Sequence, residues 1–146
     1  MQGESWDIVH GSDVAHGTWS FDVFISDKMM AQNRIAVIYD EEGNNGLGIL
    51  IKTKQNTVIN GFKTESGVES IAGAFEAEGH ISGWSHFQIT RDEEGNSTVY
   101  LNGEPILEYK DELSITPYWF YFSGPIGPAL DNVIVRDQVI DIQAPE

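Results

Sequence analysis

The stretch from Gly83 to Asp111 constrains the fold of this chain more than any other part. It contains three short runs in which hydrophobic and polar residues alternate, and a period of two is typical of β-strands with one buried face. An Asp-Glu-Glu-Gly-Asn sequence at 92–96 separates the first two runs, and Asn102-Gly103 separates the second from the third. Asn-Gly is the strongest short hairpin signal. The stretch therefore predicts three antiparallel strands joined by tight turns.

The same alternation continues through the rest of the chain, with turn residues at intervals of about 8 to 12 residues, which is typical of a β-sandwich. The only helical candidate is 66–77, where Gly67 and Gly73 would each cost about 1 kcal/mol in a helix interior. We predict an all-β fold with little or no helix, in which about eleven strands form two packed antiparallel sheets. The predicted strands are Trp6–His10, Thr18–Ser26, Arg34–Asp40, Gly46–Lys54, Thr57–Phe62, Ser70–Glu76, Ser85–Arg91, Ser97–Leu101, Pro105–Tyr109, Tyr118–Ser123 and Leu130–Arg136.

Alternation also predicts which side chains face the core. In the second strand Phe24 breaks the pattern and is predicted to face outward. In the third strand the pattern places Ile35, Val37 and Tyr39 on one side. The last strand is predicted to bury Val133 and Val135 and to leave Ile134 outside. The other predicted core residues are Trp19, Phe21, Val23, Ile25, Phe87, Ile89, Val99 and Leu101.

The chain is strongly acidic, with 23 Asp and Glu against 8 Lys and Arg and a net charge of -15. Such a surface repels phosphate backbones and anionic lipids, so we exclude nucleic-acid and membrane-surface binding. It favours cations or neutral partners such as glycans, although a host adapted to high salt would produce the same surface. At 146 residues the chain is expected to form a single domain over residues 1–146.

The sequence contains no cysteine, which excludes disulfides, zinc-thiolate sites and cysteine nucleophiles. No hydrophobic run approaches the roughly 18 residues that a membrane-spanning helix needs. The first six residues lack the basic and apolar regions of a signal peptide. We expect the domain to be excised from a larger secreted or cell-surface protein.

The five residues Asp-Glu-Glu-Gly-Asn occur twice, at 40–44 and at 92–96. We interpret both copies as hairpin turns in which the glycine takes a left-handed conformation. The alternative is a pair of calcium loops, since carboxylate and amide oxygens are hard ligands. Neither copy has the alternating ligand spacing of a dedicated cation loop, which favours the turns.

Three segments, at 17–25, at 84–103 and at 127–137, resemble strands of laminin-G-like and pentraxin-like domains in the concanavalin A-like lectin/glucanase superfamily. The resemblance implies a jelly-roll sandwich with one convex and one concave sheet. It also implies one of three roles: a lectin or carbohydrate-binding module, a glycan-cleaving enzyme, or an adhesion or spacer module.

The enzymes of this superfamily that resemble laminarinases carry Glu-x-Asp-x-x-Glu on one strand, which supplies both carboxylates for retaining hydrolysis. The nearest candidate here, Glu76-Ala77-Glu78, lacks the central Asp and the second Glu at the required offset. This absence counts against a laminarinase-type mechanism. We therefore predict no catalytic residues.

The densest aromatic run is 118–122, where alternation sends Trp119 and Tyr121 to one side. One interpretation is that these two side chains pack beneath a loop. The other is that they form a stacking platform for sugar rings, with polar contacts from Gln88 and Tyr100. His86 shares a face with Gln88 and joins the predicted ligand-binding residues.

The four histidines match no metal-binding spacing. A single structural calcium, which many relatives of the resembled fold carry, is a further hypothesis, with Asp131 as ligand and Asp22 or Asp40 as partners. No cofactor is otherwise required.

From these observations we expect a non-catalytic carbohydrate-binding or adhesion module. The alternatives are a glycan-active hydrolase with other carboxylates, or a spacer domain that binds no ligand.

Overall fold

The computed structural model describes residues 6–11, 14–25, 33–53, 56–79, 83–113, 115–124 and 130–137, and for 6–11, 53, 123–124 and 130–132 only the backbone. The described residues form eleven strands and no helix, and they therefore contain no helix that could span a membrane. The strands are β1 (Trp6–Gly11), β2 (Gly17–Ile25), β3 (Asn33–Tyr39), β4 (Gly46–Thr53), β5 (Thr57–Glu65), β6 (Val68–Glu76), β7 (Gly83–Arg91), β8 (Asn96–Leu101), β9 (Glu104–Lys110), β10 (Trp119–Gly124) and β11 (Leu130–Arg136).

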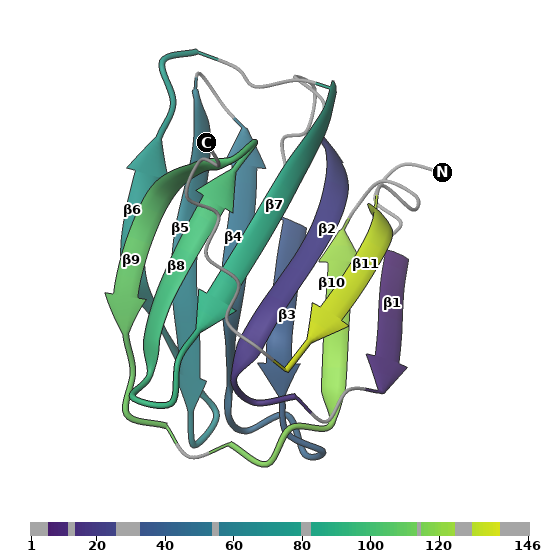
Figure 1. The fold of residues 1–146 in the computed structure, drawn as a ribbon, viewed down its shortest axis with the longest axis vertical. Coiled ribbons are helices and arrows are strands. Elements are labelled where there is room, and N and C mark those ends of the chain that lie inside the picture. Colours follow the sequence, from purple (N-terminus) through teal and green to yellow (C-terminus); the bar gives the residue numbers. More distant parts are fainter. Residues whose placement is uncertain are drawn as a thin grey trace.

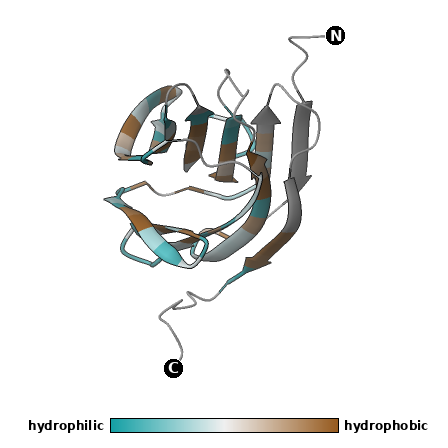
Figure 2. Ribbon diagram, turned by 90° about the horizontal axis from the view of Figure 1, so that it is seen from above, coloured by the Kyte–Doolittle hydropathy of each residue, from teal (hydrophilic) through white to brown (hydrophobic). Residues whose placement is uncertain are grey.

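These strands form two antiparallel sheets that lie face to face (Figures 1 and 2). One has six strands in the order β1-β10-β3-β4-β5-β6, and the other has five in the order β11-β2-β7-β8-β9. The predicted all-β sandwich is confirmed. The stretch 66–77 is a turn followed by β6.

The main core lies between the two sheets and is built from the inward faces of both. Trp19, Phe21, Val23 and Ile25 are fully buried, as alternation predicts. The Phe21 ring stacks on Phe87 of its own sheet at a centroid distance of 5.9 Å. It also meets Phe120 of the opposite sheet edge-on at 5.9 Å. Each such ring contributes about 1.5–3 kcal/mol through burial.

The outward predictions for Phe24 and Ile134 are also confirmed, since these side chains are 41% and 45% exposed. Val133 and Val135 pack against the main core, as predicted. The prediction for Tyr39 is wrong: Ile35 and Val37 belong to the main core, but Tyr39 packs against a second cluster on the other face of the sheet. A β-bulge is the cause.

Candidate functional site

A β-bulge at Val37 turns Tyr39 toward the outside of the six-stranded sheet. The pairing of β3 with β4 runs from Ala36 opposite Gly48 directly to Ile38 opposite Leu47, so Val37 is an extra residue. Val37 and Ile38 both enter the main core. An extra residue reverses the alternation beyond it, so Tyr39 faces outward.

The outer face of this sheet carries its own small hydrophobic layer. Ala36, Leu50 and Phe62 form a buried cluster there, and Tyr39 and Tyr121 pack against it. The two tyrosine rings lie 6.1 Å apart and are tilted by 36°. A buried layer beneath half-buried aromatic rings fixes the positions of those rings.

An ion pair crosses the same face. Nη1 of Arg34 on β3 binds Oε1 of Glu69 on β6, so the ion pair spans the two strands between them, β4 and β5. The two side chains are 30% and 31% exposed. The guanidinium carbon of Arg34 lies 5.0 Å from the centroid of the Phe62 ring, a cation–π distance. The ion pair uses one of the five N–H donors of the guanidinium.

Glu69 also owes its outward position to a bulge. In the pairing of β5 with β6, Gly61 lies opposite Gly73 and Phe62 lies opposite Ile71, so Ala72 is the extra residue. Ala72 packs against the main core. The alternation is therefore reversed before it, and Glu69 and Ile71 face outward.

The electrostatics join Tyr39 to this ion pair. Burial raises the pKa of the Tyr39 hydroxyl above its ordinary value of 10.0; Arg34 opposes that rise and Glu69 adds to it. The hydroxyl is therefore protonated at neutral pH and able to donate a hydrogen bond. Thr64, which pairs with Glu69 across β5 and β6, is 4% exposed, and its Oγ1 is buried without a hydrogen-bond partner in the described structure.

The predicted aromatic platform belongs to this surface. Trp119 lies opposite Tyr39 in the pairing of β10 with β3, and Tyr121 lies opposite Ala36. The indole N–H of Trp119 points to the carbonyl oxygen of Glu41 at 3.4 Å. The Tyr118 ring meets Trp119 edge-on, with a centroid distance of 4.4 Å.

A depression of about 300 Å³ lies beside Trp119. Its walls include Glu41 and Tyr118, which both contact the indole. Sequence analysis found Trp119 and Tyr121 but missed Tyr39, Arg34 and Glu69. We call these five side chains the six-strand surface.

The other predicted ligand-binding residues lie on the opposite sheet. His86, Gln88 and Tyr100 are on the outer face of the five-stranded sheet, where Gln88 lies opposite Tyr100. His86 is exposed, Tyr100 is half-buried, and Gln88 is buried. The structure therefore does not bring them together with Trp119 and Tyr121.

Both acidic repeats form turns in which the glycine is left-handed, as predicted, and the first turn closes one residue later than the second. Gly43 and Gly95 take φ values of 76° and 86°, and each donates its N–H to the carbonyl oxygen of the first aspartate of its repeat at 3.1 Å. The Asp92 carboxylate accepts the N–H groups of Glu94 and Asn96, both at 2.9 Å. The bonds from Asn96 are the main reason that the pKa of Asp92 lies below its ordinary value of 3.8.

Asp40 plays the same role in the first repeat, where its carboxylate accepts the N–H groups of Asn44 at 2.8 Å and Asn45 at 3.1 Å. Burial raises the pKa of Asp40, but the hydrogen bonds from Asn44, Asn45 and Gly43 outweigh it and hold the pKa below 3.8. Asp22 lies in the other sheet and pairs with His86. The side chain of Asp131 lies outside the described residues, so the calcium hypothesis stays a prediction.

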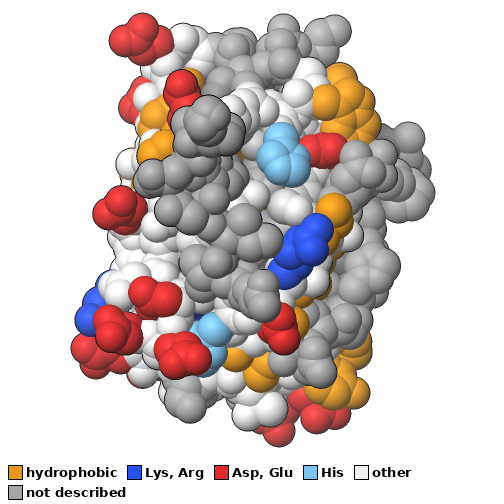
Figure 3. Space-filling model, viewed as in Figure 1, with side chains coloured by type: hydrophobic (Ala, Val, Ile, Leu, Met, Phe, Trp, Pro, Cys, Tyr) orange, Lys and Arg blue, Asp and Glu red, His pale blue; other side chains and the backbone are white. Residues whose placement is uncertain are grey.

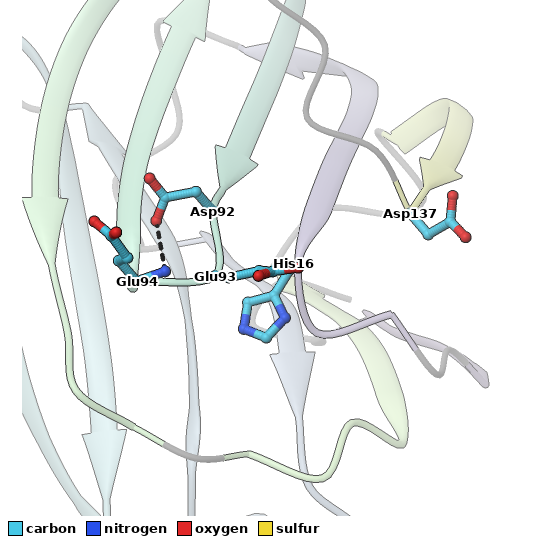
Figure 4. Close-up of a pocket in the computed structure, with 5 residues that line it drawn as sticks. All are labelled: His16, Asp92, Glu93, Glu94 and Asp137. Atoms are coloured by element: carbon cyan, nitrogen blue, oxygen red, sulfur yellow. Dashed lines mark hydrogen bonds between the residues drawn. The ribbon is translucent and has the colours of Figure 1, made fainter.

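A wider depression of about 460 Å³ lies beside the second acidic turn (Figure 4). His16, Asp92, Glu93, Glu94 and Asp137 line it. Within the described part of the chain, no three His, Asp or Glu side chains are arranged to hold a metal ion. The Asp92 carboxylate already accepts hydrogen bonds from the backbone of the turn, so it is less available to a ligand than the polar groups of the six-strand surface.

Comparison with known proteins places the fold among lectin-like sandwiches. No protein-family model and no curated protein sequence matches the chain. Among solved structures it is similar to carbohydrate-binding module CBM66 from Bacillus subtilis, with a TM-score of 0.64 and 14% identity over 91% of this chain and 80% of that one. It is also similar to galectin-Ib of Xenopus laevis, with a TM-score of 0.62 and 10% identity over 90% of this chain and 100% of the galectin.

The binding domain of botulinum neurotoxin serotype D gives a TM-score of 0.64 and 14% identity over 97% of this chain, but only 40% of that one. At these identities the similarity is one of fold. It confirms the predicted jelly-roll sandwich of lectin-like proteins.

Proposed function

We propose that this domain is a non-catalytic carbohydrate-binding module and that the six-strand surface is its glycan-binding site. The observation that carries the proposal is the Arg34–Glu69 ion pair, which spans two strands on the same outer face as Tyr39, Tyr121 and Trp119. This arrangement combines fixed aromatic rings with a paired hydrogen-bond donor and acceptor on a face outside the main core.

A sugar ring has apolar C–H faces and a rim of hydroxyl groups, so it needs both kinds of contact. Half-buried aromatic rings accept the apolar face, and a few placed polar groups orient the rim. Arg34 supplies donors, Glu69 supplies acceptors, and the protonated Tyr39 hydroxyl supplies a further donor. The ion pair carries no net charge, which suits a neutral glycan on a chain with a net charge of -15.

The fold similarity to a carbohydrate-binding module and to galectins supports this class of ligand. It also supports our inference that the chain belongs to the concanavalin A-like superfamily. We further propose that the domain acts outside the cell, as part of a larger protein, where neutral polysaccharides occur.

Titration calorimetry against soluble oligosaccharides tests the proposal. The probes are fragments of a β-glucan, a mannan, a galactan and a fructan. Trp119→Ala and Arg34→Gln should each weaken binding about tenfold or more, which corresponds to about 1.4 kcal/mol. Val68→Ala is the matched control, because Val68 is 69% exposed and directly precedes Glu69 in β6, so its side chain points away from the face that carries the ion pair.

Binding that survives both substitutions at the parental affinity would exclude the six-strand surface as the site. The absence of binding to every probe would count against the carbohydrate-binding function itself and favour a spacer domain. Thermal melting of each variant separates a lost contact from a lost fold.

A further inference from the structure

The outer face of the five-stranded sheet carries an exposed aromatic pair that the proposed function does not use. Phe24 of β2 and Trp84 of β7 lie directly opposite each other, with ring centroids 5.6 Å apart and planes at 66°. Phe24 is 41% exposed and Trp84 is 58% exposed. The two rings therefore contact each other edge to face, and most of the indole remains open to solvent.

The neighbouring cross-strand pair is polar. Asp22 and His86 lie opposite each other, two residues further along β2 and β7, and Nδ1 of His86 lies 2.7 Å from Oδ1 of Asp22. The side chains are 24% and 48% exposed. Two residues along a strand span about 7 Å, so the polar pair and the aromatic pair are about 7 Å apart along the strands.

The turn after β8 fixes this part of the sheet. The side-chain oxygen of Asn102 accepts the backbone N–H of His86 at 2.9 Å. The backbone N–H of Asn102 donates to the carbonyl oxygen of His86 at 2.7 Å. On the face shown in Figure 3, a histidine lies beside an acidic and a hydrophobic side chain. The four side chains are therefore carried by paired, hydrogen-bonded strands, and a preorganised surface of this kind loses less entropy on association.

We propose that Phe24, Trp84, Asp22 and His86 form a second contact site for a neutral glycan, on the sheet opposite the six-strand surface. Trp84 would stack on the apolar face of a sugar ring, and the aspartate and histidine would bind its hydroxyl groups. The domain would then be bivalent, with one site on each sheet. This inference takes its ligand class from the proposed function but uses a separate set of residues.

The chemistry of the patch favours a glycan over a protein partner or an anion. A stable protein interface buries about 800 Å² on each partner, whereas the exposed part of this aromatic pair is only two rings. An anionic ligand would meet the Asp22 carboxylate on a chain whose net charge is -15. A sugar ring matches the size of the patch and its combination of one apolar and one polar pair.

Oxidative footprinting with peptide mass spectrometry tests the second site, with the same oligosaccharide fragments as probes. N-bromosuccinimide oxidises accessible indoles, so Trp84 and Trp119 should react, and Trp19, which is 0% exposed, serves as an internal control. Saturating ligand should slow the oxidation of Trp84 severalfold. In calorimetry, Trp84→Ala should reduce the stoichiometry from two ligands per chain to one, whereas Val68→Ala should leave it unchanged.

The two proposals fail in different ways. If ligand protects Trp119 alone and Trp84→Ala keeps the parental stoichiometry, the second site is wrong and the first stands. If ligand protects Trp84 alone, the second site stands and the first is wrong. Absence of binding by every probe overturns both.

Discussion

The stability of this domain should depend on keeping both partners of a buried ion pair at the ends of β7 and β9. Arg91 and Asp111 have side chains only 2% and 0% exposed. The guanidinium binds the carboxylate through Nη2 at 2.5 Å and Nε at 3.1 Å. It also donates to the carbonyl oxygens of Ala15 at 2.8 Å and Leu113 at 3.1 Å. The pair therefore ties the segment before β2 to the ends of β7 and β9.

Removing one partner leaves the other charge buried without compensation, which costs about 3–5 kcal/mol. Asp111→Asn should therefore remove a large fraction of a total stability of about 5–15 kcal/mol. For a domain of this size, the melting temperature should fall by about 10 °C. Denaturant unfolding followed by tryptophan fluorescence measures the loss. Glu108→Gln, on the exposed side of β9, is the control and should change stability by less than about 0.5 kcal/mol.

A double-mutant cycle separates the ion pair from general packing. Arg91→Met combined with Asp111→Leu removes both charges, so the double variant should lose less stability than the sum of the two single variants. A loss below about 1 kcal/mol for Asp111→Asn, or simple additivity, would refute the argument that each charge depends on the other.

Two further predictions concern local geometry and acid stability. A Cβ on Gly48 would lie 1.9 Å from the carbonyl oxygen of Ile35, so Gly48→Ala should destabilise the domain by about 1–3 kcal/mol, whereas Gly73→Ala, whose nearest contact would be 3.4 Å, should cost much less. Equal losses in the melts of the two variants would contradict this. The lowered pKa values of Asp40 and Asp92 contribute stability above pH 3.8, which is lost as the pH falls through the folded-state values. Asp40→Asn combined with Asp92→Asn should therefore be less stable than the parent at pH 7, and a pH series of melting temperatures should show this difference shrinking as the pH falls below 3.8.

Sequence analysis located every strand of the described structure because the signals for strands are local. Alternation marks the buried face, and Gly43, Gly95 and the Asn102-Gly103 pair mark turns that the backbone requires. At Gly43 and Gly95 the positive φ values explain why the fourth residue of each repeat is a glycine. Local rules were sufficient wherever a strand kept its period of two.

The composition of the six-strand surface was harder to predict because it depends on pairs that are distant in sequence. Arg34 and Glu69 are 35 residues apart and lie on strands that are not adjacent. Nothing in either local sequence indicates the other. The same reasoning explains why Gln88 was predicted to contribute polar contacts beside the Trp119 and Tyr121 platform although it lies on the other sheet.

The β-bulges at Val37 and Ala72 determine which side chains the outer face of the six-stranded sheet presents. With regular alternation, Tyr39 would face the same way as Ile35 and Val37, and Glu69 the same way as Gly73, which borders the core side chain of Leu107. The extra residues Val37 and Ala72 fill the core and reverse the alternation on β3 and β6. Both reversals bring a polar side chain to one outer face, where Arg34 joins Glu69 beside Tyr39. The core and the surface are thus set by different features of the strands, so sequences that share the alternation can share the fold while differing in what they bind.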